Sequence, residues 1–208
     1  TNTSGTWSCS SEVDRLDGAH TVGATANDQA GNVSSLAVRS FTLDATPPPA
    51  PTLTQPLNGL ATVAASLVIS GHASSLAVVK IYDHASQVAS VVAAIDGSWS
   101  FEIDPIDEGD YDFTAREFDD YDNFSVPSST SSVRVDRTAP TVSFAVHPAA
   151  RSNQANAVFG LSADEPNVDF ECALDSGAWL PCSASPVFNG LAEGSHTLRI
   201  RGSDRAGN

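Results

Sequence analysis

Acidic side chains are the most abundant groups in this 208-residue sequence that could do chemistry. The 25 Asp and Glu residues outnumber the 10 Lys and Arg residues and give a formal net charge of −15 at pH 7. Carboxylate oxygens are the ligands that hard cations such as calcium prefer. The same charge repels nucleic-acid phosphates and anionic membrane surfaces. We therefore keep calcium as a candidate ligand and expect no nucleic-acid partner. No apolar run approaches the thickness of a bilayer, so we expect no membrane insertion.

The remaining reactive side chains do not form a catalytic pattern. The five histidines lack the spacing of a zinc site. The many serines include no Gly-x-Ser-x-Gly elbow and no Ser, His and Asp set suited to a pocket. We therefore expect no enzymatic activity and no catalytic residues.

The three cysteines carry information about redox state. Cys172 and Cys182 flank a predicted strand, turn and strand, and pairing across such a hairpin would bring them within disulfide reach. Cys9 stands beside Trp7 as Cys182 stands beside Trp179, so we expect the partner of Cys9 to lie outside this stretch of chain. Disulfides indicate an oxidising, extracellular compartment. The alternative is three free, buried thiols.

One stretch that occurs three times organises the acidic residues. In each copy a Gly precedes an Asp by ten positions, and an Asn follows that Asp by four; the sets are Gly18, Asp28 and Asn32, then Gly109, Asp119 and Asn123, then Gly194, Asp204 and Asn208. Between the Gly and the Asp the residues alternate as in a strand with one buried face. The Asp can accept bonds from backbone N–H groups, so a tight turn should follow the strand.

A ring stands two residues after each repeated Gly, at His20, Tyr111 and His196. We expect this ring to reach back to the backbone, which resembles the tyrosine corner of immunoglobulin-like sandwiches. The repeats lie about ninety residues apart, the size of one such sandwich. Each repeat also has one Trp shortly before its Gly (Trp7, Trp99 and Trp179), which we interpret as core or half-buried packing rather than as a ligand-binding aromatic.

The repeats divide the chain into three units of an all-β fold. Residues 1–44 hold only the later strands of a domain, and the proline-rich stretch 44–51 is a stiff linker. Residues 45–136 contain a full set of strands, which we predict at 67–71, 77–82, 88–95, 98–103, from 111 onward and at 131–135, with a turn at Asp96-Gly97. Residues 137–208 lack the last strand, so the chain starts and ends in mid-domain.

Several motifs resemble the bacterial Ig-like repeats of very large secreted and surface proteins. In the third unit they are Phe159-Gly160-Leu161-Ser162-Ala163-Asp164-Glu165-Pro166, Phe170-Glu171-Cys172-Ala173-Leu174-Asp175 and Asp204-Arg205-Ala206-Gly207-Asn208. The second unit resembles the adhesin-type subfamily through Ile69-Ser70-Gly71-His72-Ala73 and Asp96-Gly97-Ser98-Trp99-Ser100. The resemblance implies tandem immunoglobulin-like antiparallel β-sandwiches, one complete and two partial. One departure is Tyr121-Asp122 in place of Ala-Gly, which predicts a different turn in the second unit.

The resemblance also implies calcium at the junctions between units, because several such adhesin families bind it there. The matching positions are the turn and linker residues Asp28, Asn32, Asp44, Asp119, Asp122, Asn123 and Asp136. Calcium prefers six to eight oxygen ligands, which a junction can gather. The alternative is that these are ordinary turn residues, since none of the runs is an EF-hand loop.

These features predict a non-catalytic stalk or spacer segment of an extracellular bacterial adhesin or other secreted protein, whose partners are the neighbouring Ig-like repeats. One alternative is an adhesion module that binds a surface glycan or protein through exposed aromatics, for which Tyr82, Tyr121 and Phe124 are the candidates. Another is an accessory segment of a secreted hydrolase. A third is a subunit of an extracellular fibre, in which strands from neighbouring chains complete the partial domains.

Overall fold

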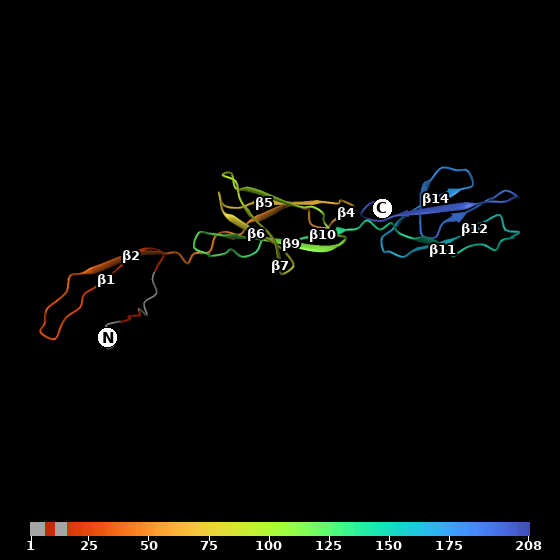
Figure 1. Ribbon diagram of the computed structural model, residues 1–208. Coiled ribbons are helices and arrows are strands. Elements are labelled where there is room, and N and C mark those ends of the chain that lie inside the picture. The colour runs from red at the N-terminus through yellow and green to blue at the C-terminus, as the bar shows by residue number, and fades with distance from the viewer. Residues whose placement is uncertain (1–6, 11–15) are drawn as a thin grey trace.

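The computed structural model describes residues 7–10 and 16–208, and these residues form strands, turns and loops without any helix. The strands form three groups that follow one another along the chain (Figure 1), which we call the first, second and third units. Within the described residues every strand pairs only inside its own unit. No described segment forms an apolar helix of membrane-spanning length.

The second unit is a sandwich of two sheets. One sheet has the order β3-β5-β8 and the other the order β4-β10-β9-β6-β7. The bounds are β3 Thr52–Gln55, β4 Leu60–Thr62, β5 Leu67–His72, β6 Val78–Asp83, β7 Ser86–Val92, β8 Ser98–Ile103, β9 Gly109–Phe118 and β10 Ser131–Val135. The predicted strands therefore all form, with ends that differ by a few residues.

The core of the second unit lies between these two sheets. Strand β5 alternates buried Leu67 and Ile69 with exposed Val68, as a strand with one covered face requires. Ile69, Val79, Ile81 and Phe113 are fully buried and pack in one cluster with Trp99. Burying each such side chain stabilises the fold by about 1.5–3 kcal/mol.

The turn at Asp96-Gly97 forms, and it carries the chain from one sheet to the other. The backbone N–H of Gly97 donates to the carbonyl of Ala94 at 2.9 Å. The flanking strands do not pair with each other, because β7 pairs with β6 and β8 pairs with β5. A turn motif gives no information about which sheet the next strand joins, so the sequence could not settle this point.

The first unit is an antiparallel ribbon of two strands, β1 Gly18–Ala24 and β2 Ala37–Leu43. Apolar side chains on it, including Val22, Val38 and Phe41, remain exposed. The core or half-buried position predicted for Trp7 is wrong, because Trp7 is 61% exposed, whereas Trp99 is 4% exposed and Trp179 is half-buried as predicted. The described part of the first unit has no opposing sheet against which an indole could pack.

The third unit contains three small sheets, with the orders β11-β13, β12-β16 and β15-β14-β17. Their strands are β11 Val142–Val146, β12 Ala157–Val158, β13 Gly160–Ala163, β14 Asp169–Leu174, β15 Leu180–Cys182, β16 Val187–Phe188 and β17 Leu198–Ser203. Cys172 of β14 and Cys182 of β15 form a disulfide with a Cα–Cα distance of 5.8 Å, so the predicted pairing across the hairpin is confirmed. Cys9 is a free, exposed thiol.

Candidate functional site: the junctions between units

The three repeated turns share one hydrogen-bonded geometry. In the first unit Asp28 Oδ1 accepts the backbone N–H groups of Ala30 and Asn32, both at 2.9 Å. Asp28 Oδ2 accepts the side-chain amide of Asn32 at 2.7 Å. The same bond from Asn amide to Asp carboxylate measures 2.9 Å in both other turns, from Asn123 to Asp119 and from Asn208 to Asp204. The Asp residue thus accepts backbone N–H groups as predicted, and the Asn closes the turn.

These bonds also set the acidity of the carboxylates. The Asn amide in the turn, followed by backbone N–H groups, lowers the pKa of Asp28 and of Asp204. At Asp119 desolvation acts in the opposite direction, but the bonds from Asn123 and the backbone still lower the pKa. The three carboxylates are therefore ionised acceptors at neutral pH.

The turn of the second unit follows the common geometry, so the predicted difference there is wrong. Asp119 Oδ1 accepts the backbone N–H groups of Tyr121 at 2.8 Å and Asn123 at 2.9 Å. Asp122 adopts a left-handed backbone with φ 65°, where the third unit has Gly207 with φ 96°. Asp tolerates this conformation better than most residues, which explains how the turn survives without Gly.

The ring after each repeated Gly reaches back to a backbone carbonyl, as predicted. The hydroxyl of Tyr111 donates to the carbonyl of Asp107 at 2.9 Å. Histidine replaces tyrosine without losing the bond: Nε2 lies 2.7 Å from the Leu16 carbonyl at His20 and 3.0 Å from the Ala192 carbonyl at His196. A carbonyl only accepts, so Nε2 carries the proton in both histidines.

At the first junction the linker is bonded to the units on both sides. The side-chain amide of Asn123, in the turn of the second unit, donates to the backbone carbonyl of Asp44 at 3.1 Å. On the other side, the carboxylate of Asp17 in the first unit accepts the backbone N–H of Ala45 at 2.9 Å and the hydroxyl of Thr46. Two residues of the linker are thus held by the preceding unit and one by the following unit.

The second junction repeats this arrangement. The side-chain amide of Asn208 donates to the backbone carbonyl of Asp136 at 2.8 Å, so the chain end lies against the linker (Figure 1). The hydroxyl of Thr138 donates to Glu108 Oε1 at 2.8 Å. Arg137 adds bonds from its guanidinium to two carbonyls of the second unit. We call the shared arrangement the linker latch: an Asn of the following unit bonds the linker Asp carbonyl, and an acid of the preceding unit bonds the linker Thr.

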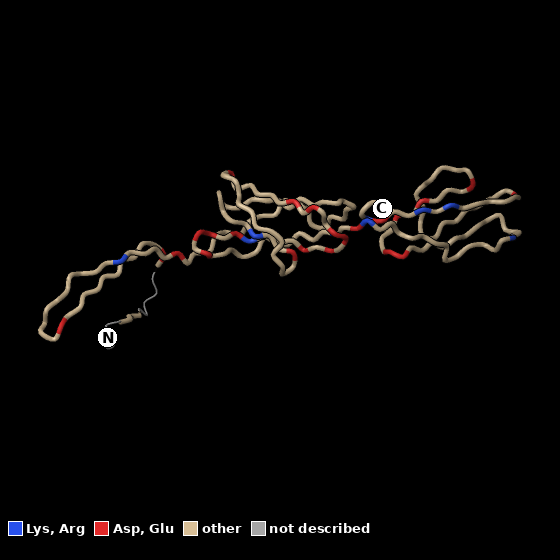
Figure 2. The backbone as a smooth tube through the Cα atoms, in the orientation of Figure 1, with Lys and Arg blue, Asp and Glu red and all other residues tan. Residues whose placement is uncertain are grey.

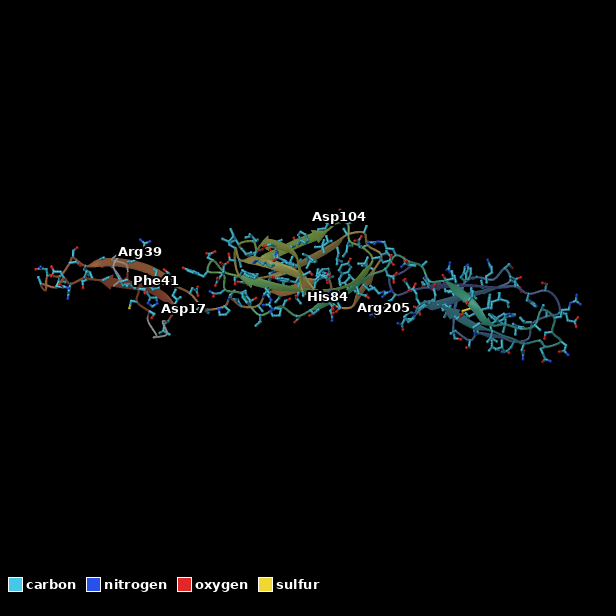
Figure 3. All side chains as sticks on the ribbon, turned by 60° about the horizontal axis from the view of Figure 1, so that its bottom comes forward. Asp17, Arg39, Phe41, His84, Asp104 and Arg205 are labelled. Atoms are coloured by element: carbon cyan, nitrogen blue, oxygen red, sulfur yellow. A yellow bond between two sulfur atoms is a disulfide. The ribbon has the colours of Figure 1, made fainter. Side chains whose placement is uncertain are left out.

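Three carboxylates meet at the second junction. Ligand atoms of Asp136, Glu165 and Asp204 all lie within 4.8 Å of one another, beside a cleft of about 460 Å³ between the second and third units. Arg134 already neutralises part of this charge, because its Nε donates to Asp136 Oδ2 at 3.0 Å. That bond lowers the pKa of Asp136, whereas desolvation and the two Asp carboxylates raise the pKa of Glu165. Figure 2 shows the acidic residues at this junction, and Figure 3 labels Arg205, which also lines the cleft.

The residues predicted for calcium do not gather in one place. Asn123 meets the Asp44 carbonyl at the first junction, in the same turn as Asp119. The turn of Asp28 and Asn32 lies at the end of the β1–β2 ribbon opposite the linker, because Gly18 pairs with Leu43 at the linker end. Among the described residues, three acidic groups come within ligand distance of one another only at the second junction, around Asp136.

The other two members of that cluster were absent from the predicted set. Asp204 occupies the position of Asp28 and Asp119 in the third copy of the repeat, so the spacing alone could have added it. Glu165 follows β13 in a loop, and nothing in its spacing connects it to the linker. Three carboxylates suit calcium in ligand type, but Arg134 competes with a cation for Asp136. Calcium therefore stays a prediction.

Comparison with known proteins supports the resemblance in the first unit. Residues 1–45 match the family model described as the bacterial Ig-like domain, which confirms the resemblance to bacterial Ig-like repeats over that stretch. No curated protein sequence matches the chain.

Solved structures similar to this chain include fibronectin(III)-like modules of Clostridium thermocellum CbhA, with 20% identity and a TM-score of 0.38 over 42% of this chain and 97% of that chain. A biofilm associated protein, BSP domain, has 20% identity and a TM-score of 0.34 over 60% of this chain and 20% of that chain. The human OSCAR ligand-binding domain has 15% identity and a TM-score of 0.38 over 74% of this chain and 90% of that chain.

Proposed function

We propose that this chain is a spacer segment of a bacterial surface or secreted protein, in which Ig-like units are held end to end by the linker latch. The observation that carries the proposal is that the latch forms at both junctions, through Asn123 to Asp44 and through Asn208 to Asp136. A spacer has to keep its units from folding back on one another. Bonds from the linker to both neighbours restrict that motion.

The linkers themselves are conformationally restrained. Three consecutive prolines, Pro47 to Pro49, follow the first latch, and proline fixes its backbone near an extended conformation. Asp44 and Asp136 also restrain their own linkers, because each carboxylate accepts the backbone N–H of the residue two positions further on. The distance is 3.0 Å from Asp44 to Thr46 and 3.2 Å from Asp136 to Thr138. A stiff linker bonded at both ends transmits orientation from one unit to the next.

The alternative role as a glycan- or protein-binding module would need exposed aromatics on one face. Tyr121 and Phe124 are about half exposed, in and next to the turn of the first junction. Phe124 packs against Phe118 with ring centroids 5.8 Å apart. Tyr82 is only partly exposed and lies opposite Thr114, further along the sheet. This spread of aromatic rings favours the spacer over the binding module.

The spacer role is tested by small-angle X-ray scattering from the full chain and from a double variant, Asn123→Ala with Asn208→Ala. We expect the original chain to give the scattering of a single extended shape. The double variant should have a smaller radius of gyration and a broader distribution of interatomic distances, while the circular dichroism spectrum stays unchanged. An original chain that scatters as a flexible string of units would contradict the spacer role.

We also propose that calcium reinforces the second junction, because Asp136, Glu165 and Asp204 are gathered there. The ion would take one carboxylate from the second unit and two from the third, and would neutralise their repulsion. Isothermal titration of the full chain with calcium should show a single site that Glu165→Gln weakens. Glu102→Gln, a change at an exposed residue of β8, is the matched control. A titration in which calcium does not bind would contradict the proposal.

A further inference from the structure

The outward face of β6, β7 and β9 in the second unit carries side chains that the linker latch does not use. Strand pairing places them in three rows across the sheet. The rows are Val92, Val78, Phe118 and Phe124, then Ser90, Lys80 and Arg116, then Gln87, Tyr82 and Thr114. The residues between the rows, Val79, Ile81 and Ala115, belong to the core, so the rows point away from it. We call this surface the three-row face; its rows are apolar, cationic and hydrogen-bonding.

The cationic row has no acidic partner. Lys80 and Arg116 lie directly opposite each other on neighbouring strands, where like charges repel. Among the described residues, arginines form ion pairs with carboxylates at Arg134 and Arg201, but neither Lys80 nor Arg116 forms one. None of the residues in the three rows is acidic, although the chain has 25 Asp and Glu residues. The two cations are therefore available to an anion from outside the chain.

Two phenylalanine rings hold the cations in place. Lys80 Nζ lies 3.7 Å from the centroid of the Phe118 ring, and the guanidinium carbon of Arg116 lies 5.4 Å from that of Phe124. Arg116 Nη1 also donates to the carbonyl of Ser125 at 3.4 Å. That bond uses one of the five N–H groups of the guanidinium. The side chain is thus oriented and keeps donors for a ligand, beside a Phe124 ring that is 53% exposed.

The main chain under the three-row face is already bonded on both sides. β6 pairs with β9 on one edge and with β7 on the other. On the edge of β9 away from β6, the carbonyls of Ala115 and Glu117 accept the backbone N–H groups of Ser128 and Ser125. A peptide that binds as an added strand needs a free edge, which β6 and β9 lack here. Recognition on this face therefore depends on side chains, and this favours a sugar over a peptide strand.

The overall charge of the chain limits the kind of anion. A net charge of −15 repels anionic polymers at long range. A ligand with a single carboxylate meets less of this repulsion, because salt screens charges more than about 10 Å away while Lys80 and Arg116 act at contact. The ligand that fits is thus a neutral body with one carboxylate.

We propose that the three-row face binds a sugar residue that bears a carboxylate. The carboxylate pairs with Lys80 and Arg116, the C–H groups of the sugar ring pack on Phe118 and Phe124, and the sugar hydroxyls bond to the third row. The aromatic rings alone are too widely spread to form a binding face, so the cationic row supplies the specificity. No residue of the linker latch takes part, so this binding adds to the spacer role and does not depend on it.

NMR titration of the isotope-labelled full chain with methyl glycosides tests the proposal. The acidic probes are methyl glucuronide, methyl galacturonide and methyl N-acetylneuraminide, and the neutral controls are methyl glucoside and methyl galactoside. We expect at least one acidic probe to give saturable amide shifts at 78–82, 87–92 and 114–118. The neutral sugars should bind about 10-fold more weakly or not at all, because they lack the charge-assisted hydrogen bonds.

Three variants separate the cationic row from the total charge. Arg116→Gln and Lys80→Gln should each weaken the binding of the acidic probe about 10-fold. Arg151→Gln is the matched control, because it removes the same charge at an exposed position of the third unit and should leave binding unchanged. Ser90→Glu keeps both cations but adds a carboxylate to their row at an exposed position, so it should abolish binding.

Several results would overturn the inference. One is the absence of saturable shifts with every acidic probe, and another is a set of shifts confined to other elements. Equal weakening by Arg151→Gln and Arg116→Gln would show that the effect comes from total charge. Acetate that binds as tightly as the acidic sugars would show that the face accepts any carboxylate, and the assignment to a sugar would be wrong.

Discussion

Replacing Asn123 by Ala removes two hydrogen bonds, one within its own turn and one to the linker. The Asn123 amide donates to Asp119 within its own turn at 2.9 Å and to the Asp44 carbonyl at 3.1 Å. A hydrogen bond contributes about 1 kcal/mol net. Loss of the junction bond should therefore reduce the ratio of docked to undocked first junctions about five-fold.

Asn32→Ala is the matched control for this change. Among the described residues the Asn32 amide bonds only Asp28, inside its turn. Both variants thus lose one bond within a turn, but Asn123→Ala alone loses a bond to the linker. Subtracting the two effects isolates the junction.

Residual dipolar couplings of backbone amides provide the assay. In the original chain, and in Asn32→Ala, the amides of β1–β2 and of β9–β10 should fit one alignment tensor. In Asn123→Ala the first unit should show reduced couplings, since it reorients relative to the second. If Asn123→Ala leaves both sets of couplings on a common tensor, the amide bond to Asp44 does not hold the junction.

Three further changes test other parts of the structure. Asp122→Gly should raise the free energy of unfolding of the second unit by about 0.5–1 kcal/mol, because φ 65° is a left-handed conformation that glycine adopts at lower cost than aspartate. An unchanged or lower stability in a melting experiment would contradict this. Replacing Cys172 and Cys182 by Ser should destabilise the third unit by about 2–3 kcal/mol through the loop that the disulfide closes, and denaturant unfolding measures it; equal midpoints would refute it. The bonds of His196 to the Ala192 carbonyl and to Asp175 raise its pKa above the ordinary 6.5. The stabilisation that protonated His196 contributes should therefore be fully present below pH 6.5 and lost as the pH rises through the folded pKa. Thermal melting of His196→Gln and of the original chain at several pH values measures this: the difference between their melting temperatures should shrink as the pH rises.

Local features of the fold could be predicted from the sequence because they depend on residues close together in the chain. Alternation predicted the strands, and the ring that follows each Gly predicted the backbone contact at Tyr111. The spacing of Cys172 and Cys182 predicted their bond. The turn at Asp96-Gly97 was predicted too, but the sheets of its flanking strands were not, because strand pairing is set by contacts distant in sequence.

The linker latch could be predicted only in part. Repetition placed Asp and Asn in each turn and Asp in each linker, but the acceptor for Asn123 is a backbone carbonyl, which every residue has. An acidic residue also precedes each repeated Gly, and a Thr recurs in each linker. The bond between Glu108 and Thr138 could therefore have been predicted from the spacing of these residues. The position of Glu165 at the second junction could not have been predicted in this way, because only the tertiary fold brings it there.

Pulsed electron–electron double resonance, which measures the distance between a spin label on the second unit and one on the third, tests the proposed spacer most directly. Spin labels at Gln87→Cys and Ser176→Cys, both exposed positions, would be introduced in a Cys9→Ser background. The linker latch from Asn208 to Asp136 predicts one narrow distance distribution, which broadens in Asn208→Ala. A distribution that is already broad in the original chain, and unchanged by Asn208→Ala, would show that the units move independently and that the latch does not hold them end to end.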